Sequence, residues 1–212
     1  MLGNHMTTHD PSLSISAEEC LTRLKAGNER FLNGTASFPT VQKDILASLA
    51  RGQHPYATII GCSDSRVPPE LIFDANFGEL FVIRVAGNVV SPEIAGSLQY
   101  AGLHLKTPLF VVLGHDNCGA VQAALDKKFR QAQHAGRIEL LLERILPALE
   151  QIDAQAKPAS QIAHAVEANV RWTIRQIAES PEGRARAAEG NYLLMGAIYE
   201  IATGRVRFLE PV

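Results

Sequence analysis

The sequence contains little cysteine and no excess of charge of either sign. Three cysteines among 212 residues are too few for a disulfide framework. The 20 basic and 22 acidic residues leave a net charge of −2, so we expect neither a nucleic-acid-binding face nor a charged tail. Apolar stretches stay short of the roughly 20 residues that span a bilayer, and no basic segment precedes an apolar run as in a secretory signal. These absences predict a cytoplasmic protein with no membrane or nucleic-acid partner.

The length predicts a single domain over residues 1–212, because a chain of this size can bury one substantial core. No internal repeat and no low-complexity linker divides it. Residues 1–15 are expected to be flexible. Residues 1–5 look like the remnant of an expression tag, with the natural start at Met6.

Apolar runs and helical stripes alternate along most of the chain. Runs with hardly any polar residue, such as 80–85 and 109–114, are typical of strands that are covered on both faces of a parallel sheet. Ser16 and Glu19 form a capping-box signal for an N-terminal helix. Thr203 and Gly204 predict a turn between two final strands. The expected fold is α/β, with a mostly parallel central sheet, an antiparallel edge hairpin, flanking helices and an N-terminal helical arm. Strands are predicted at 56–61, 80–85, 109–114, 192–201 and 205–209. Helices are predicted to begin near residues 16, 39, 70, 91, 118, 136 and 160. The helix from 136 is expected to run to about 154, and Ser160 is expected to cap the next one.

Chemically active side chains follow the first predicted strand, where residues 62–66 read Cys-Ser-Asp-Ser-Arg. Alternate side chains of an extended segment point the same way, so Cys62, Asp64 and Arg66 can face one site. This segment therefore offers one site a thiolate, a carboxylate and a fixed positive charge.

A second group of ligand types follows the run 109–114. His115 and Cys118 are three residues apart, a spacing that suits one turn at the start of a helix. Both side chains can therefore bind the same ion. Ligands gather beyond the carboxyl ends of the strands in open sheets of this kind. If the two strands are neighbours, Cys62, His115 and Cys118 form a set that zinc favours.

The role of Asp64 stays open at this stage. As a fourth protein ligand it would close the site, and the zinc would be structural. If it pairs with Arg66 instead, the fourth position is left to water and the site would be catalytic. Each cluster alone also fits an ordinary turn or a helix cap, and only the two together favour a metal.

Two other residues bear on this interpretation. Cys20 lies in a helical pattern, so we expect it to be a small core residue. Arg84 interrupts an apolar strand, which predicts a buried ion pair with Glu79 or Asp74.

At this point the chain resembles the β-class carbonic anhydrases. The resemblance implies one zinc ion per subunit, held by Cys62, His115 and Cys118. It also implies that Arg66 holds Asp64, which accepts a hydrogen bond from the hydroxide on the metal and can swing onto the metal in a closed state at lower pH. The resemblance extends from residues 27–31 to the turn at 203–204, and its specific motifs are 62–68, 78–88, 97–101 and 114–120.

The same resemblance implies a substrate pocket and an oligomer. Gln53 would hydrogen-bond bicarbonate, with the amide of Gly119 nearby, and an apolar wall would suit carbon dioxide. Members of the family are dimers or larger in which a neighbouring subunit supplies part of each pocket, so a homodimer or a dimer of dimers is implied. The apolar wall falls on Phe81, Ala86 and Tyr100.

The function implied is that of a zinc lyase, a carbonic anhydrase (carbonate dehydratase) that converts carbon dioxide reversibly to bicarbonate and a proton. His54 is a candidate for passing that proton to buffer. Two alternatives stay open. One is a hydrolase of carbon disulfide or carbonyl sulfide on the same scaffold, and the other is a non-catalytic zinc-stabilised module.

Overall fold

The computed structural model describes residues 15–37 and 43–210, and the structural statements below concern these residues. Five strands form one sheet in the order β2-β1-β3-β4-β5. The neighbours in this order pair in parallel, except β4 and β5, which pair antiparallel. The mostly parallel sheet with an antiparallel edge hairpin is therefore confirmed. The strands are β1 (Ala57–Gly61), β2 (Leu80–Arg84), β3 (Leu109–His115), β4 (Leu193–Tyr199) and β5 (Val206–Phe208).

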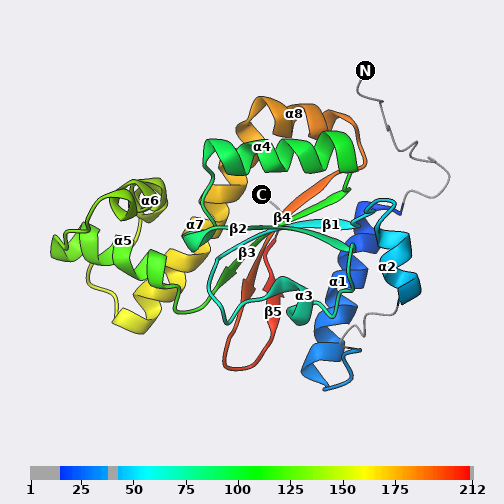
Figure 1. Ribbon diagram of the computed structural model, residues 1–212. Helices are drawn as coiled ribbons and strands as arrows, with labels where there is room; N and C mark the ends of the chain where they lie inside the picture. The colour runs from blue at the N-terminus through cyan, green and yellow to red at the C-terminus, as the bar shows by residue number, and fades with distance from the viewer. Residues whose placement is uncertain (1–14, 38–42, 211–212) are drawn as a thin grey trace.

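Helices cover both faces of this sheet (Figure 1). In Figure 1, α4 and α8 lie above the sheet, α1 and α3 lie below it, and α5 and α6 project at the left. The helices are α1 (Ala17–Leu32), α2 (Lys43–Leu49), α3 (Pro69–Ile72), α4 (Pro92–Tyr100), α5 (Gly119–Arg130), α6 (Arg137–Ile145), α7 (Pro158–Glu179) and α8 (Pro181–Ala188). Shorter turns are η2 (Ala86–Asn88), the π-helical η3 (Ala101–Leu105) and η4 (Leu146–Leu149).

Adjacent residues of the central strands divide between two hydrophobic cores. Ile59 and Val111 pack on the α1 side, whereas Ile60 and Val112 pack on the side of α5 and α7. Successive strand residues point to opposite faces, so a strand with a core on each side needs an apolar residue at nearly every position. This explains why β3, at the centre of the sheet, is buried along its whole length.

The expectation of full burial is wrong for β2, which is an edge strand. Leu80, Phe81 and Val82 are only half-buried. In the part of the chain that the structure describes, β1 is the only strand that pairs with β2. An apolar edge of this kind leaves backbone groups and side chains available to a partner.

Several predicted helix boundaries are wrong. α7 begins at Pro158, so Ser160 lies inside the first turn and does not cap it; proline is favoured at this first position because its fixed φ suits a helix. The helix predicted from residue 136 ends at Ile145 and tightens into η4 at Pro147, well before residue 154. The predicted start at residues 39–40 lies outside the described residues.

Helix α8 was not predicted, although its start carries a local signal. The Ser180 Oγ accepts a hydrogen bond from the Gly183 amide at 2.9 Å, and Pro181 occupies the first helical position. Serine followed by proline is typical of a helix start. Within the described residues, no helix combines the length and the apolarity needed to cross a bilayer.

The N-terminal helix begins as expected. The Ser16 Oγ accepts from the Glu19 amide at 3.1 Å, and the Ser16 amide donates to the Glu19 carboxylate at 2.8 Å, so the capping box is confirmed. Cys20 of α1 is fully buried, and burial raises the pKa of its thiol to about 11. A buried neutral thiol is inert, which fits the predicted core role of Cys20.

Candidate metal centre

Three side chains that are far apart in the sequence meet at the carboxyl ends of two neighbouring strands. Cys62 follows β1, His115 ends β3, and Cys118 is the residue before α5. Because β1 and β3 pair in parallel, their carboxyl ends lie side by side. The ligand atoms of these three residues all lie within 4.8 Å of one another, and the two sulfur atoms are 4.0 Å apart. This group can hold a metal ion.

The histidine of this group presents one nitrogen without a partner. His115 is fully buried, and its Nδ1 lies 2.9 Å from the Asp116 carbonyl oxygen. Nδ1 therefore carries the proton and donates, which leaves a lone pair on Nε2. The buried Nε2 has no hydrogen-bond partner among the described residues. A metal ion at Nε2 would satisfy it, with Asp116 fixing the ring as metal-bound histidines are usually fixed.

The two thiols behave as a pair. The hydrogen bond between them lowers the pKa of Cys62 and raises that of Cys118. Two negative charges at this separation repel each other, so the pair keeps one proton as long as no cation lies between the sulfur atoms. The donor set therefore suits a divalent ion with a preference for thiolate.

Asp64 and Arg66 form a bidentate pair beside this group. The Arg66 Nε and Nη2 donate to the two Asp64 carboxylate oxygens at 2.9 and 2.7 Å, and the Arg66 amide adds a bond of 3.0 Å. The hydrogen bonds from Arg66 hold the pKa of Asp64 well below its usual range. The Asp64 Oδ2 lies 3.8 Å from the His115 Nε2, beyond a hydrogen bond but within the same small space. The carboxylate is therefore an ionised acceptor at the edge of the centre.

Arg84 does not make the predicted ion pair with Glu79 or Asp74. Its Nε donates to the Cys62 carbonyl at 3.0 Å, and its Nη2 donates to the Asp64 carbonyl at 2.5 Å. β2 pairs with β1, so Arg84 at the end of β2 lies next to the segment that follows β1. Arg84 thus fixes the backbone that carries Cys62 and Asp64, a role that a reading of its own strand could not reveal.

Two of the predicted pocket residues lie close to this centre. Ala86 begins η2, whose next residue, Gly87, donates its amide to the Cys62 Sγ at 3.4 Å. Gly119 directly follows Cys118 and is exposed at the N-terminus of α5. Both backbone segments can therefore contact a small molecule at the metal position.

The other predicted pocket residues lie toward the opposite end of the sheet. Phe81 pairs with Thr58, four residues before Cys62, which corresponds to ~13 Å along the strand. The Tyr100 ring packs against Phe81 at 6.1 Å between centroids. Gln53 and His54 are exposed and precede the amino end of β1. Within a single chain, these residues therefore lie away from the metal centre.

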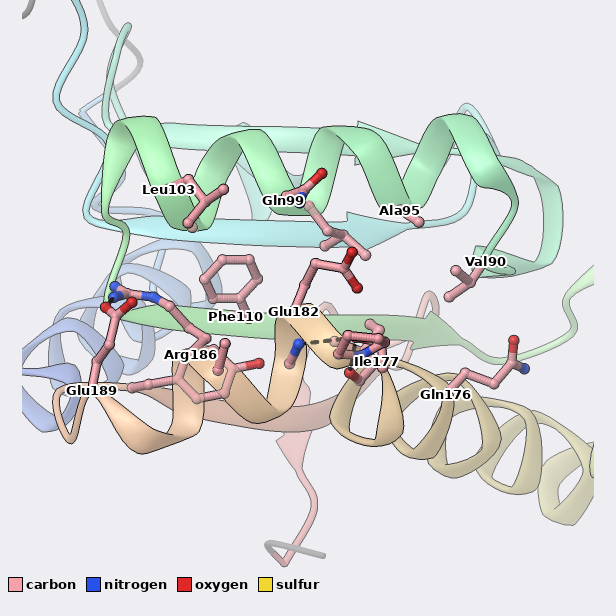
Figure 2. Close-up of a pocket in the computed structure, with 17 residues that line it drawn as sticks. Val90, Ala95, Gln99, Leu103, Phe110, Gln176, Ile177, Glu182, Arg186 and Glu189 are labelled. Carbon is pink, nitrogen blue, oxygen red and sulfur yellow. Dashed lines mark hydrogen bonds and ion pairs between the residues drawn. The ribbon is translucent and has the colours of Figure 1, made fainter.

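A separate hollow of about 300 Å³ lies between α4, η3 and the α7–α8 corner (Figure 2). Figure 2 shows Phe110 at its base and Arg186 reaching across from α8 toward Glu189. Its lining is mostly apolar, and none of the predicted site residues contributes to it. The hollow is therefore distinct from the metal centre.

Comparisons with known proteins agree with this arrangement. A family model described as "Carbonic anhydrase" matches residues 57–206. Carbonic anhydrase 2 of Mycobacterium tuberculosis is 39% identical over 183 residues, which cover 86% of this chain and 87% of that protein. The structure of a Coccomyxa β-carbonic anhydrase in complex with acetazolamide has a TM-score of 0.72 at 30% identity, covering 91% of this chain and 87% of that one. One of two β-carbonic anhydrases of Sordaria macrospora, described as tetrameric, has a TM-score of 0.71 at 27% identity, covering 91% and 95%.

Proposed function

The chain belongs to the β-class carbonic anhydrases, and from this premise we propose that it hydrates carbon dioxide reversibly at a zinc ion held by Cys62, His115 and Cys118. The observation that carries the proposal is the buried group of two thiols and one imidazole, whose Nε2 has no partner among the described residues. Two sulfur donors and one nitrogen donor fit zinc, and they leave a fourth position free, as catalytic zinc sites require. When bound, zinc lowers the pKa of water toward about 7 and so supplies a hydroxide nucleophile.

The chain's own residues orient that nucleophile. We propose that Asp64 would accept a hydrogen bond from the hydroxide that a bound zinc ion supplies, and would so orient this hydroxide toward the substrate. Arg66 keeps the carboxylate ionised and in place through its two side-chain hydrogen bonds. In a closed state the Asp64 carboxylate would have to move onto the metal, against the two side-chain hydrogen bonds that hold it to Arg66.

The product also needs hydrogen-bond donors, because bicarbonate carries a negative charge. The Gly119 amide, at the N-terminus of α5, is the proposed donor from the same chain, since the first amides of a helix favour anions. The proton released in the reaction would pass to buffer.

The remaining pocket residues come from a second subunit in this proposal. Gln53, Phe81 and Tyr100 lie too far along the sheet to reach the metal centre of their own chain. The tetrameric relative and the half-buried apolar edge strand β2 both support a homo-oligomer. Tyr100 is 47% exposed, as expected for a side chain that a partner covers.

Subunit mixing tests this shared pocket. We expect Gln53→Ala alone to lose at least about tenfold in activity, since a hydrogen bond to a charged product contributes about 1.5–3 kcal/mol. Cys62→Ser alone should be inactive. When the two variants are unfolded and reassembled together in equal amounts, half of the dimers are hybrids with one intact site. The mixture should therefore regain about a quarter of wild-type activity per subunit.

The matched control mixes Cys62→Ser with Cys118→Ser. Both changes lie in the same metal centre, so no hybrid contains an intact site and activity should stay at background. If the Gln53→Ala mixture also stays at background although native mass spectrometry shows hybrid dimers, the shared pocket is wrong.

One sample decides the main proposal. Stopped-flow measurement of carbon dioxide hydration and a metal count by mass spectrometry are made on the same wild-type preparation, with carbon disulfide assayed beside it. We expect about one zinc ion per chain and rapid hydration that a strong chelator abolishes. Zinc without hydration would favour the non-catalytic module, and turnover of carbon disulfide alone would favour the hydrolase.

A further inference from the structure

We propose that Asn169 and Thr173 of α7 are positioning residues of the metal centre, although neither is a metal ligand. They hold the turn η2 so that the Gly87 amide donates to the Cys62 sulfur. The inference rests on the proposed function, because it concerns the sulfur of Cys62 as a ligand.

The turn η2 has an unfavourable backbone conformation. Gly87 has a φ of 67° and Asn88 a φ of 44°, so two consecutive residues occupy the left-handed region. For Asn88 this conformation costs about 1 kcal/mol. A side chain at Gly87 would also clash, since a Cβ there would lie 2.8 Å from the Ile145 Cδ1. Such a turn persists only when its surroundings hold it.

Two buried side chains of α7 hold this turn from the same helix face. The Asn169 Nδ2 donates to the Gly87 carbonyl at 2.8 Å, and the Thr173 Oγ1 donates to the Asn88 carbonyl at 3.1 Å. Residues four apart lie on the same side of a helix. Each of these side chains is only 1% exposed. Together they satisfy two consecutive carbonyls of the turn.

The same face of α7 also packs against the strand segment that carries the histidine ligand. Val170, between the two polar residues, lies so close to Gly114 that a Cβ there would be 2.5 Å from the valine Cγ2. Gly114 directly precedes His115, so α7 supports the segments on both sides of the metal centre. Through these contacts α7 sets the position of the Gly87 turn relative to the strand that carries His115.

Packing alone does not account for these polar residues. Burying an amide or a hydroxyl costs free energy that an aliphatic side chain would not. In addition, the Asn169 Oδ1 and the Asn88 Nδ2 are buried and have no partner among the described residues. Leucine and valine here would avoid this cost, but they would leave the Gly87 and Asn88 carbonyls without these partners. What the polar pair supplies is the orientation of the Gly87 amide toward the sulfur.

That amide affects the metal through the sulfur. A hydrogen bond to a ligating thiolate draws electron density from it and fixes its direction, and partners of this kind commonly change metal affinity 10- to 100-fold. The Gly87 amide would therefore hold the Cys62 sulfur in the direction that metal binding needs, and a displaced amide would weaken zinc binding.

The test compares Asn169→Leu and Thr173→Val with Gln161→Met. Gln161 also lies on α7, is 8% exposed, and donates its Nε2 to the Asp153 carbonyl at 2.8 Å. It is thus a matched amide-to-carbonyl contact outside the metal centre. Three quantities are measured for each variant. Zinc affinity is determined by competition with a chromophoric chelator, and the thiolate-to-metal absorption band is recorded after cobalt substitution. Thermal unfolding is followed on the metal-free protein.

We expect Asn169→Leu to weaken zinc binding by about 10- to 100-fold and to shift the cobalt band. Thr173→Val should act in the same direction, and Thr173→Ser, which keeps the hydroxyl, should restore wild-type values. Gln161→Met should lower thermal stability without changing either metal readout. If Asn169→Leu does not fold, Thr173→Val and its serine rescue carry the test.

Unchanged zinc affinity and an unchanged cobalt band in the folded α7 variants would overturn the inference and leave the proposed function intact. A wild-type protein that binds no zinc would instead overturn the proposed function and, with it, the basis of this inference.

Discussion

Replacing Cys62 by serine is expected to remove the metal and the activity together. Serine keeps the shape of cysteine, but its hydroxyl does not ionise near neutral pH and is a poor zinc ligand. Only His115 and Cys118 would then remain, fewer than the three protein ligands of a catalytic zinc site. We expect zinc to fall from about one ion per chain to less than about a tenth, and hydration to fall about a thousandfold.

The matched control is Cys20→Ser, which makes the same chemical change in α1. Cys20 is buried in the core on the α1 side of the sheet, away from the three ligand atoms. Its replacement should lower the free energy of unfolding by about 1–3 kcal/mol, because a hydroxyl is buried there, and should leave zinc content unchanged. A Cys62→Ser protein that retains zinc and turnover would refute the assigned ligand set.

The replacement Asp64→Asn is expected to separate metal binding from turnover. The three ligands are untouched, so zinc content should stay at about one ion per chain. The amide of asparagine has one acceptor oxygen in place of two, and its NH₂ group would face the donors of Arg66. The acceptor for the attacking hydroxide is then lost or misdirected, and we expect kcat to fall about 100- to 1,000-fold.

Asp126→Asn is the control for this change. Asp126 pairs with Arg130 on the exposed part of α5, through a hydrogen bond of 2.6 Å, and it contacts none of the metal ligands. Its loss should change stability by no more than about 0.5 kcal/mol and leave turnover unchanged. Loss of zinc in Asp64→Asn would identify Asp64 as a permanent ligand, and full activity would remove its proposed role.

These two substitutions address different parts of one arrangement. Cys62 tests whether donors from two strand ends share an ion, and Asp64 tests whether the adjoining carboxylate acts on the substrate side of that ion. A structural zinc site would lose its zinc in Cys62→Ser. Such a site has no turnover in the wild type, so Asp64→Asn could not lower it.

The sequence by itself determined the features that depend on short-range pattern and ligand chemistry. The apolar runs at 56–61 and 109–114 predict buried strands because the side-chain period of a strand is local. Cys62, His115 and Cys118 predict a metal centre because each lies at a strand end, where side chains converge. The parallel sheet, its edge hairpin and the family resemblance all follow from such local signals and from their order.

Only the tertiary structure decided which residues from distant segments meet. Arg84 reaches the carbonyls of Cys62 and Asp64 because β2 pairs with β1, whereas the sequence suggested a charged partner nearby. Asn169 contacts Gly87 across 82 positions of the chain because α7 packs against η2. The separation of Phe81 from Cys62 depends on strand register. Such contacts result from the packing of whole elements, and hydrophobic periodicity carries no information about which element lies beside which.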